Sequence, residues 1–143
     1  MKCSALKGSA AISSAVKNSM LAVAAYFLLG FATSCQSAHD RAVEQAKAQV
    51  GGDPGRGAFL LQRYGCGGCH RIPGVMGAAG KAAPSLEHLS NEAYISGNLA
   101  NTPQNVMRWI VSPHSVLPKT KMPEYGIGDA EARDITTYLW SLR

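Results

Sequence analysis

The chain has 143 residues and a formal net charge of +5, from 14 basic and 9 acidic side chains. Three of the lysines lie in an N-terminal stretch that contains no acid. Without that stretch 11 basic and 9 acidic residues remain, a net charge of +2, which is too weak to indicate nucleic-acid binding. The remaining length suits one small domain, and 15 glycines and 7 prolines predict long loops.

The N-terminal segment has the pattern of an export signal. Lysines are followed by an apolar run at 20–33, which is short for a membrane span. Ala32-Thr33-Ser34-Cys35 resembles a bacterial lipobox, whose cysteine becomes lipidated, although lipoboxes favour leucine where this chain has Ala32. We expect residues 1–34 to be a signal peptide. Its processing has three alternatives: a lipoprotein anchored through Cys35, a soluble cleaved protein, or a retained N-terminal anchor. Each puts the folded domain on the periplasmic side of the bacterial cytoplasmic membrane.

Residues 35–52 are expected to connect this segment to a folded domain at 53–143. The stretch 38–50 is polar and rich in alanine, which is typical of a tether that is partly helical.

The first helix of the domain is expected to begin at Asp53-Pro54, which supply an N-cap and a first-turn proline. Gly65 ends it, and 72–84 is rich in glycine and proline, as in a loop. The apolar face at helical spacing comprises Gly57, Leu60, Leu61 and Tyr64.

Two longer helices follow. Thr102-Pro103 opens one, and the other begins near Gly128 or Asp129. Their apolar stripes comprise Val106, Trp109 and Ile110 with Met107 at the edge, and Ala132, Ile135, Leu139 and Leu142. No strong strand pattern accompanies them, so the expected fold class is all-α, with short helices and long loops.

Two of the four cysteines form the sequence Cys66-Gly67-Gly68-Cys69-His70. This is the attachment motif of haem c, in which each thiol adds to one haem vinyl group and the histidine ligates the iron. The small Gly67 and Gly68 are expected to let the backbone turn tightly beneath the porphyrin edge.

Other uses of these cysteines fit less well. A structural zinc site would need a second ligand pair, and His88 and His114 lack finger spacing. A thioredoxin-like redox pair would need a βαβ context, and a plain disulfide gives no role to His70.

A second axial ligand must come from elsewhere in the chain. Met76 is only six residues beyond His70, close for reaching the far haem face, whereas Met122 is 52 residues beyond it in a proline-flanked loop. The other candidates are Met107, which also suits a helix core, and His88 and His114, which also suit the surface.

The chain from Asp53 to Arg143 resembles class I cytochrome c. Three stretches carry the resemblance: Gly57 to His70, Pro103 to Pro123 with its Met122-Pro123, and Ala130 to Leu142. It implies the cytochrome c fold, with three to five short helices around one covalently bound haem and with the first and last helices crossing. It also implies that Met122 is the second axial ligand.

The resemblance implies two further roles near the haem. Pro84 matches the loop proline whose carbonyl oxygen accepts a hydrogen bond from the ligating histidine, here His70. Trp109 falls where the family has a large aromatic side chain against the haem, which is compatible with an ordinary core tryptophan. Residues 71–101 match no single member well, so the propionate contacts stay unassigned.

The function implied is one-electron transfer without catalysis, because two axial ligands leave no open iron position. The implied partners of this monomer are a quinol–cytochrome c reductase, a terminal haem–copper oxidase or a periplasmic dehydrogenase, and no nucleic acid. Lys119 and Lys121 are candidates for a positive rim or are ordinary solvated lysines. Two alternatives remain: a fixed haem c subunit of a larger oxidoreductase complex, and a peroxidase or gas sensor with a labile ligand.

Overall fold

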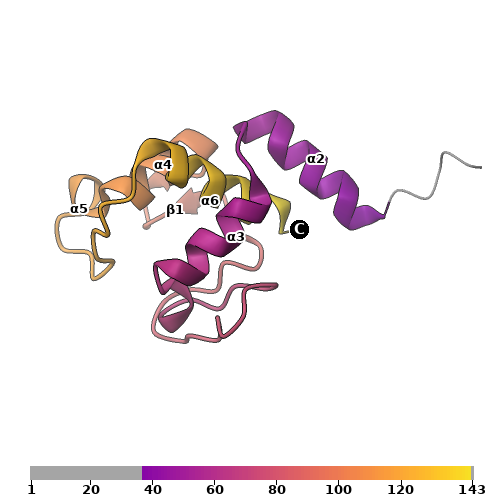
Figure 1. Cartoon of the computed structure of the whole chain (residues 1–143). Helices are drawn as coiled ribbons and strands as arrows, with labels where there is room; N and C mark the ends of the chain where they lie inside the picture. The colour runs from indigo at the N-terminus through magenta and orange to yellow at the C-terminus, as the bar shows by residue number, and fades with distance from the viewer. Residues whose placement is uncertain (1–36, 143) are drawn as a thin grey trace, which may run out of the picture. The chain divides into compact units, whose positions relative to one another are not determined.

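A computed structural model describes residues 37–142 (Figure 1). The predicted signal peptide and Cys35 lie outside the described residues. The helices are α2 (Ala38–Val50), α3 (Pro54–Arg63), α4 (Pro103–Val111), α5 (Pro113–Val116) and α6 (Asp129–Ser141), with 3-10 turns η1 (Cys66–Gly68) and η2 (Leu89–Asn91). Two short strands, β1 (Tyr94–Ile95) and β2 (Leu99–Ala100), complete the described elements, so the chain is all-α in class. None of the described helices has the length and hydropathy to cross a membrane.

Helix α3 begins where the sequence predicts. The Asp53 side chain accepts hydrogen bonds from the backbone N–H groups of Gly55 (2.8 Å) and Arg56 (3.2 Å), and Pro54 fills the first turn. The face that contains Gly57, Leu60 and Leu61 is buried against α6. Burying one such leucine stabilises the folded state by about 1.5–3 kcal/mol. The packing of α3 against α6 therefore forms the centre of the domain.

The crossing of α3 and α6 depends on a missing side chain and on a buried carboxylate. A Cβ atom at Gly57 would overlap the backbone carbonyl oxygen of Asp134, so the two helices approach too closely for any other residue. Asp134 is buried, with 7% of the residue exposed. It accepts a 2.8 Å hydrogen bond from the Asp53 N–H and lies 3.4 Å from the Arg56 guanidinium, so this buried charge is paired, as burial requires.

Helix α4 supplies the other wall of the core. Thr102 caps it by accepting a hydrogen bond from the Asn105 N–H (3.2 Å), as its sequence predicts. Val106 and Ile110 are buried against α6, and Trp109 is half-buried beside them. Met107 is also half-buried and packs on the same core.

Helix α2 differs from the tether that the sequence suggests for 38–50. It is a full helix that begins with a capping box between Ser37 and Asp40 and ends at Gly51, whose φ is +82°. Ala46 is completely buried and α2 packs on α6 (Figure 1). The compact unit therefore starts at Ser37, because the small alanine side chain lets α2 approach α6 closely.

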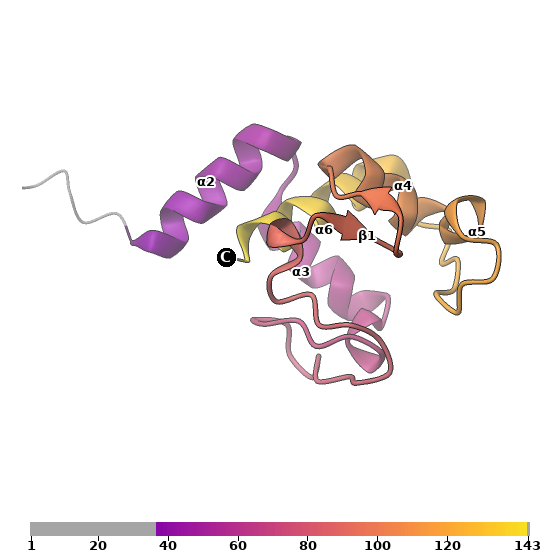
Figure 2. The same cartoon turned by 180° about the vertical axis from the view of Figure 1, so that it is seen from behind.

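The β1–β2 hairpin was not expected from the sequence pattern. Its strands pair antiparallel with Tyr94 opposite Ala100, and Figure 2 shows the first of them, β1. The turn between them uses positive φ at Ser96 (+46°) and Gly97 (+92°). The Asn101 side chain fixes the hairpin to η2 by donating to the carbonyl oxygens of Leu89 and Glu92. With two residues in each strand, the alternation is too short to be recognised in the sequence.

Candidate haem-binding site

The Cys66–His70 motif lies on one tight turn directly after α3. Gly65 has a φ of +69°, which ends α3 and starts η1. The N–H groups of Cys69 (3.2 Å) and His70 (3.0 Å) both donate to the carbonyl oxygen of Cys66. Local backbone hydrogen bonds therefore hold both thiols and the imidazole in one small region.

The two glycines inside the motif have different surroundings. A Cβ atom at Gly67 would lie 2.5 Å from the Ala78 Cα, because the loop after the motif folds back onto η1. The Gly80 N–H donates to the Gly67 carbonyl oxygen (3.0 Å), which fixes that approach. A Cβ at Gly68 would meet nothing within 4 Å. Gly67 therefore serves loop packing, and the role of the two glycines in a tight turn beneath the porphyrin edge stays a prediction.

Both thiols of the motif are free. Cys66 is half-buried and Cys69 is exposed. Burial raises the pKa of the Cys66 thiol. In the described part of the chain, no cluster of three or more His, Cys, Asp or Glu side chains is placed to hold a metal ion. Two adjacent free thiols are the arrangement that thioether formation with two vinyl groups requires.

The His70 imidazole is oriented by a residue 14 positions away. Its Nδ1 lies 2.7 Å from the carbonyl oxygen of Pro84. A carbonyl oxygen only accepts hydrogen bonds, so Nδ1 carries the proton and donates it. Nε2 is left with its lone pair, which is the tautomer that a metal-ligating histidine needs.

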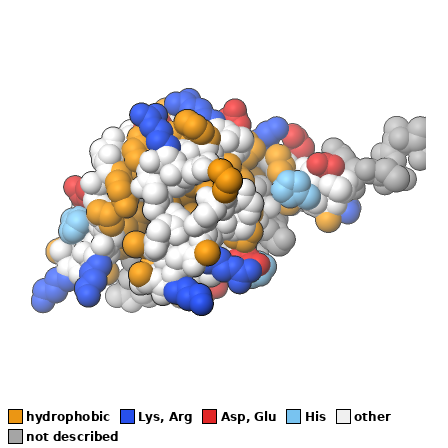
Figure 3. Space-filling view, turned by 60° about the horizontal axis from the view of Figure 1, so that its bottom comes forward, with side chains coloured by type: hydrophobic (Ala, Val, Ile, Leu, Met, Phe, Trp, Pro, Cys, Tyr) orange, Lys and Arg blue, Asp and Glu red, His pale blue; other side chains and the backbone are white. Residues whose placement is uncertain are grey.

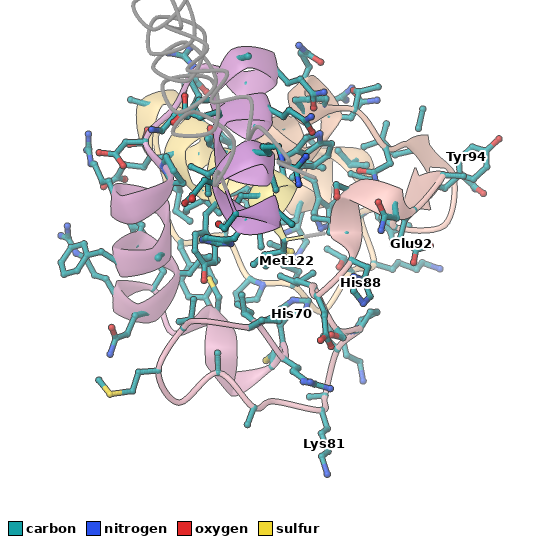
Figure 4. All side chains as sticks on the ribbon, turned by 90° about the vertical axis from the view of Figure 1, so that its right-hand side faces the viewer. His70, Lys81, His88, Glu92, Tyr94 and Met122 are labelled. Atoms are coloured by element: carbon teal, nitrogen blue, oxygen red, sulfur yellow. The ribbon has the colours of Figure 1, made fainter. Side chains whose placement is uncertain are left out.

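Met122 is half-buried in the loop between α5 and α6. Its N–H donates to the Thr120 hydroxyl (3.1 Å). In the view of Figure 4, Met122 and His70 lie in the same central region of the domain, whereas Lys81 and Tyr94 point away from it. The structure therefore leaves Met122 as a candidate partner of His70, and its role as a ligand stays a prediction.

The other predicted ligand candidates have different surroundings. Met76 is 79% exposed, and Met107 packs on the hydrophobic core. His88 is exposed, and His114 is exposed and lies 3.5 Å from the Glu124 carboxylate. Trp109 contacts the core from α4, and its predicted contact with the haem stays a prediction.

Two tyrosines near the motif were not singled out as site residues by the sequence analysis. Tyr64 directly precedes Gly65, and its ring centroid lies 6.1 Å from that of Tyr125, with the planes tilted by 50°. Burial raises the pKa of Tyr125, and the neighbouring Cys66 and Cys69 thiols raise it further. Tyr125 therefore contacts Tyr64, which lies two residues before the attachment motif. The available sequence signal was its position three residues after Met122.

The chain's own residues fit a covalently attached haem. The thiols are free, and the His70 tautomer presents Nε2 to a metal. Leu117 and Tyr125 are 41% and 40% exposed on the loop that contains Met122. Apolar side chains left half-covered by the protein are the surface that a porphyrin shields. A haem would thus meet attachment points, a metal ligand and an apolar lining.

Two relatives carry the name cytochrome c oxidase subunit 2. The chain is 29% identical over 89 residues to that of Alkalihalophilus pseudofirmus, covering 62% of this chain and 25% of the relative. It is 31% identical over 106 residues to that of Bacillus sp. (strain PS3), covering 71% of this chain and 30% of the relative. The chain thus spans between a quarter and a third of the length of these two relatives.

A third relative is closer in length. The chain is 26% identical over 98 residues to cytochrome c-552 of Bradyrhizobium diazoefficiens, covering 68% of this chain and 83% of the relative. No solved structure matches the chain. The family model "Cytochrome c" matches residues 54–143, well over half of the chain and including the attachment motif, the Pro84 loop and α6. The chain therefore belongs to the cytochrome c family, and its cofactor is a covalently attached haem c.

Proposed function

We propose that this protein is a one-electron carrier whose single haem c is attached through Cys66 and Cys69 and ligated by His70 and Met122. The observation that carries the proposal is the 2.7 Å hydrogen bond between His70 Nδ1 and the Pro84 carbonyl oxygen. It gives the imidazole the tautomer and basicity of a strong axial ligand. Met122 is supported by its half-buried place in the loop between α5 and α6.

The haem supplies the one-electron chemistry, and the chain's residues set its conditions. His70 is held by Pro84 so that its ring does not rotate away. A thioether Met122 ligand favours the ferrous state and raises the potential relative to histidine. With His70 and Met122 both bound to the iron, no position would be left for a substrate, so the protein would carry electrons without catalysing a reaction of its own.

Charge at the exposed side of the domain is proposed to guide its redox partners. Figure 3 brings the side opposite the top of Figure 1 forward. Hydrophobic side chains are scattered over it, and Lys and Arg side chains stand around its margin together with some Asp and Glu side chains. Lys119 and Lys121 are exposed beside Met122. Exposed lysines beside the Met122 loop favour a partner with an acidic rim, because opposite charges speed up the encounter. A quinol–cytochrome c reductase, a terminal oxidase or a periplasmic dehydrogenase are the proposed classes of partner.

Carbon monoxide tests the carrier proposal. The ferrous wild-type holoprotein should not change its visible spectrum under carbon monoxide within the mixing time and for minutes afterwards, because Met122 occupies the position that the gas needs. The oxidised protein should show the far-red absorption band typical of a methionine–iron bond. Immediate binding of carbon monoxide would instead favour a peroxidase or gas sensor with a labile ligand.

The relatives support a second candidate, a haem c subunit held within a larger oxidoreductase complex. Two of them are named as oxidase subunits and are three to four times longer than the matched segment. A chain of this kind would pass electrons within one assembly rather than diffuse. Purification from gently solubilised membranes separates the two functions: a carrier is recovered alone, whereas a subunit is recovered with a stoichiometric oxidase.

We also propose that the chain is exported and held at the periplasmic face of the membrane by a lipid on Cys35. Only Gln36 separates this cysteine from Ser37, the N-cap of α2. The connection would then be a helix about 20 Å long, at about 1.5 Å per residue, that packs on α6. Such a link would keep the haem domain close to membrane-embedded redox complexes.

The Cys35→Ser variant tests this location. It should move the holoprotein from the membrane fraction to the soluble periplasmic fraction, or leave an unprocessed precursor, because lipid chains provide stable anchoring. Its visible spectrum should match that of wild type, since the described domain begins at Ser37. Mass spectrometry of the wild-type N-terminal peptide is the direct check. A peptide that begins after Cys35, or an intact signal segment, would exclude lipidation.

A further inference from the structure

The loop that carries Met122 has little backbone hydrogen bonding to hold it in place. Residues 117–128 contain no helix or strand. Within the described chain, residues 121–127 take part in no hydrogen bond between two backbone groups. The position of Met122 must therefore be set by side chains on the loop and by the residues that those side chains contact.

The side chains of Glu124, Tyr125 and Ile127 attach this loop to the domain. Ile127 is 4% exposed and fixes the end of the loop near α6. Glu124 accepts a hydrogen bond from the Ser112 hydroxyl (3.0 Å) and lies 3.5 Å from His114 at the surface, where an ion pair contributes little. Tyr125 packs on the ring of Tyr64, at a centroid distance of 6.1 Å. Of these contacts, that of Tyr125 reaches Tyr64, the residue that ends α3.

Tyr64 is itself held in place from two sides. Its hydroxyl donates a 2.7 Å hydrogen bond to the Glu131 carboxylate in α6. The Arg63 guanidinium lies 5.8 Å from its ring centroid. The bond to Glu131 raises the pKa of Tyr64, so the phenol keeps its proton and its bond at neutral pH. Tyr64 thus presents a fixed ring surface to the Met122 loop.

We propose that Tyr64, Tyr125 and Glu131 form a tyrosine clasp that holds the Met122 loop closed over the haem. This inference rests on the proposed function, because it takes Met122 to be the second iron ligand. The clasp joins the loop to both α3 and α6, the two helices that cross at the centre of the fold. Tyr64 and Tyr125 are positioning residues, and they determine how often the methionine leaves the iron and opens that position to an external ligand.

Cyanide binding to the ferric holoprotein measures this opening. At saturating cyanide the observed rate is limited by departure of the methionine. Tyr125→Ala should raise that rate roughly two- to tenfold, the factor expected for loss of one aromatic pair. Hydrogen exchange of the peptide spanning 117–128, followed by mass spectrometry, should increase in the same variant. If Tyr125→Ala yields no holoprotein, Tyr125→Leu carries the test.

A double-mutant cycle shows whether the two rings act as one unit. In a Tyr64→Ala background, Tyr125→Ala should add little further increase, because the contact is already gone. The matched control is Tyr94→Ala, the same truncation at an exposed tyrosine in the hairpin, which should bind cyanide at the wild-type rate. Additive effects of the two clasp variants, or an equal acceleration in Tyr94→Ala, would overturn the clasp.

The wild-type rate separates failure of the clasp from failure of the proposed function. If wild type binds cyanide as fast as Met122→Ala, then Met122 is not the ligand and both proposals fall. If wild type is slow and Tyr125→Ala is equally slow, the ligand assignment stands and the clasp alone is refuted.

Discussion

The Cys66→Ala, Cys69→Ala double variant should contain no covalently bound haem. Each thiol forms one thioether, so either single change should leave a weaker, single attachment and the double change should leave none. Both cysteines lie on the turn that follows Gly65, where Cys66 is half-buried and Cys69 is exposed. Haem staining of a denaturing gel measures the attachment, and an immunoblot of the same gel measures the amount of chain. Intact mass spectrometry then shows whether the haem mass is present.

The control for attachment is a variant outside the motif. Met76→Ala changes an exposed residue of the following loop and should stain like wild type for the same amount of chain. A strong stain from the double variant would contradict c-type attachment through these cysteines. A full stain from both single variants, with none from the double, would mean that either thioether alone is enough to retain the haem.

The helices that form the core were predictable because their signals are local. Asp53-Pro54 and Thr102-Pro103 cap α3 and α4 as the sequence indicates. The apolar spacing in α6 correctly marks Ala132, Ile135 and Leu139 as buried. Capping and helical periodicity act within a few residues, so the sequence contains nearly all the information that decides them.

The packing of helix α2 could not be predicted from local sequence signals. The capping box between Ser37 and Asp40 was present in the sequence, but the hydrophobic content of 38–50 is low. The buried residue of α2 is Ala46. Its small side chain is buried because α6 passes beside α2. A small side chain gives no signal of burial until its neighbour is known, so the segment resembled a tether.

The candidate site likewise has one part that the sequence reveals and other parts that depend on the fold. The five-residue attachment motif is contiguous and could be recognised directly. The contact between His70 and Pro84 spans 14 residues and came from the family resemblance rather than from spacing. Tyr64, Tyr125 and Glu131 come from three separate segments, and nothing in the sequence pairs them. The closeness of Gly67 to Ala78 likewise depends on how the loop 70–84 folds back.

Replacing the proposed second ligand should have the largest effect on the redox properties. Met122→Ala should remove the far-red band and give a high-spin or water-bound spectrum, because alanine offers no ligand. The reduction potential should fall by on the order of 0.1 V, within the roughly 0.8 V that axial ligands control. The ferrous variant should also bind carbon monoxide at once, unlike wild type. Optical redox titration and gas addition to the same samples measure all three changes.

Two matched methionine variants decide whether this effect is specific. Met76→Ala truncates a side chain that is 79% exposed and should alter neither spectrum nor potential. Met107→Ala should leave the spectrum intact but lower the thermal midpoint, because Met107 packs on the core and its removal leaves space there. If Met107→Ala is the variant that loses the far-red band and binds carbon monoxide, Met107 is the axial ligand. The loop that carries Met122 would then only cover the haem edge, and the tyrosine clasp would have no ligand to hold.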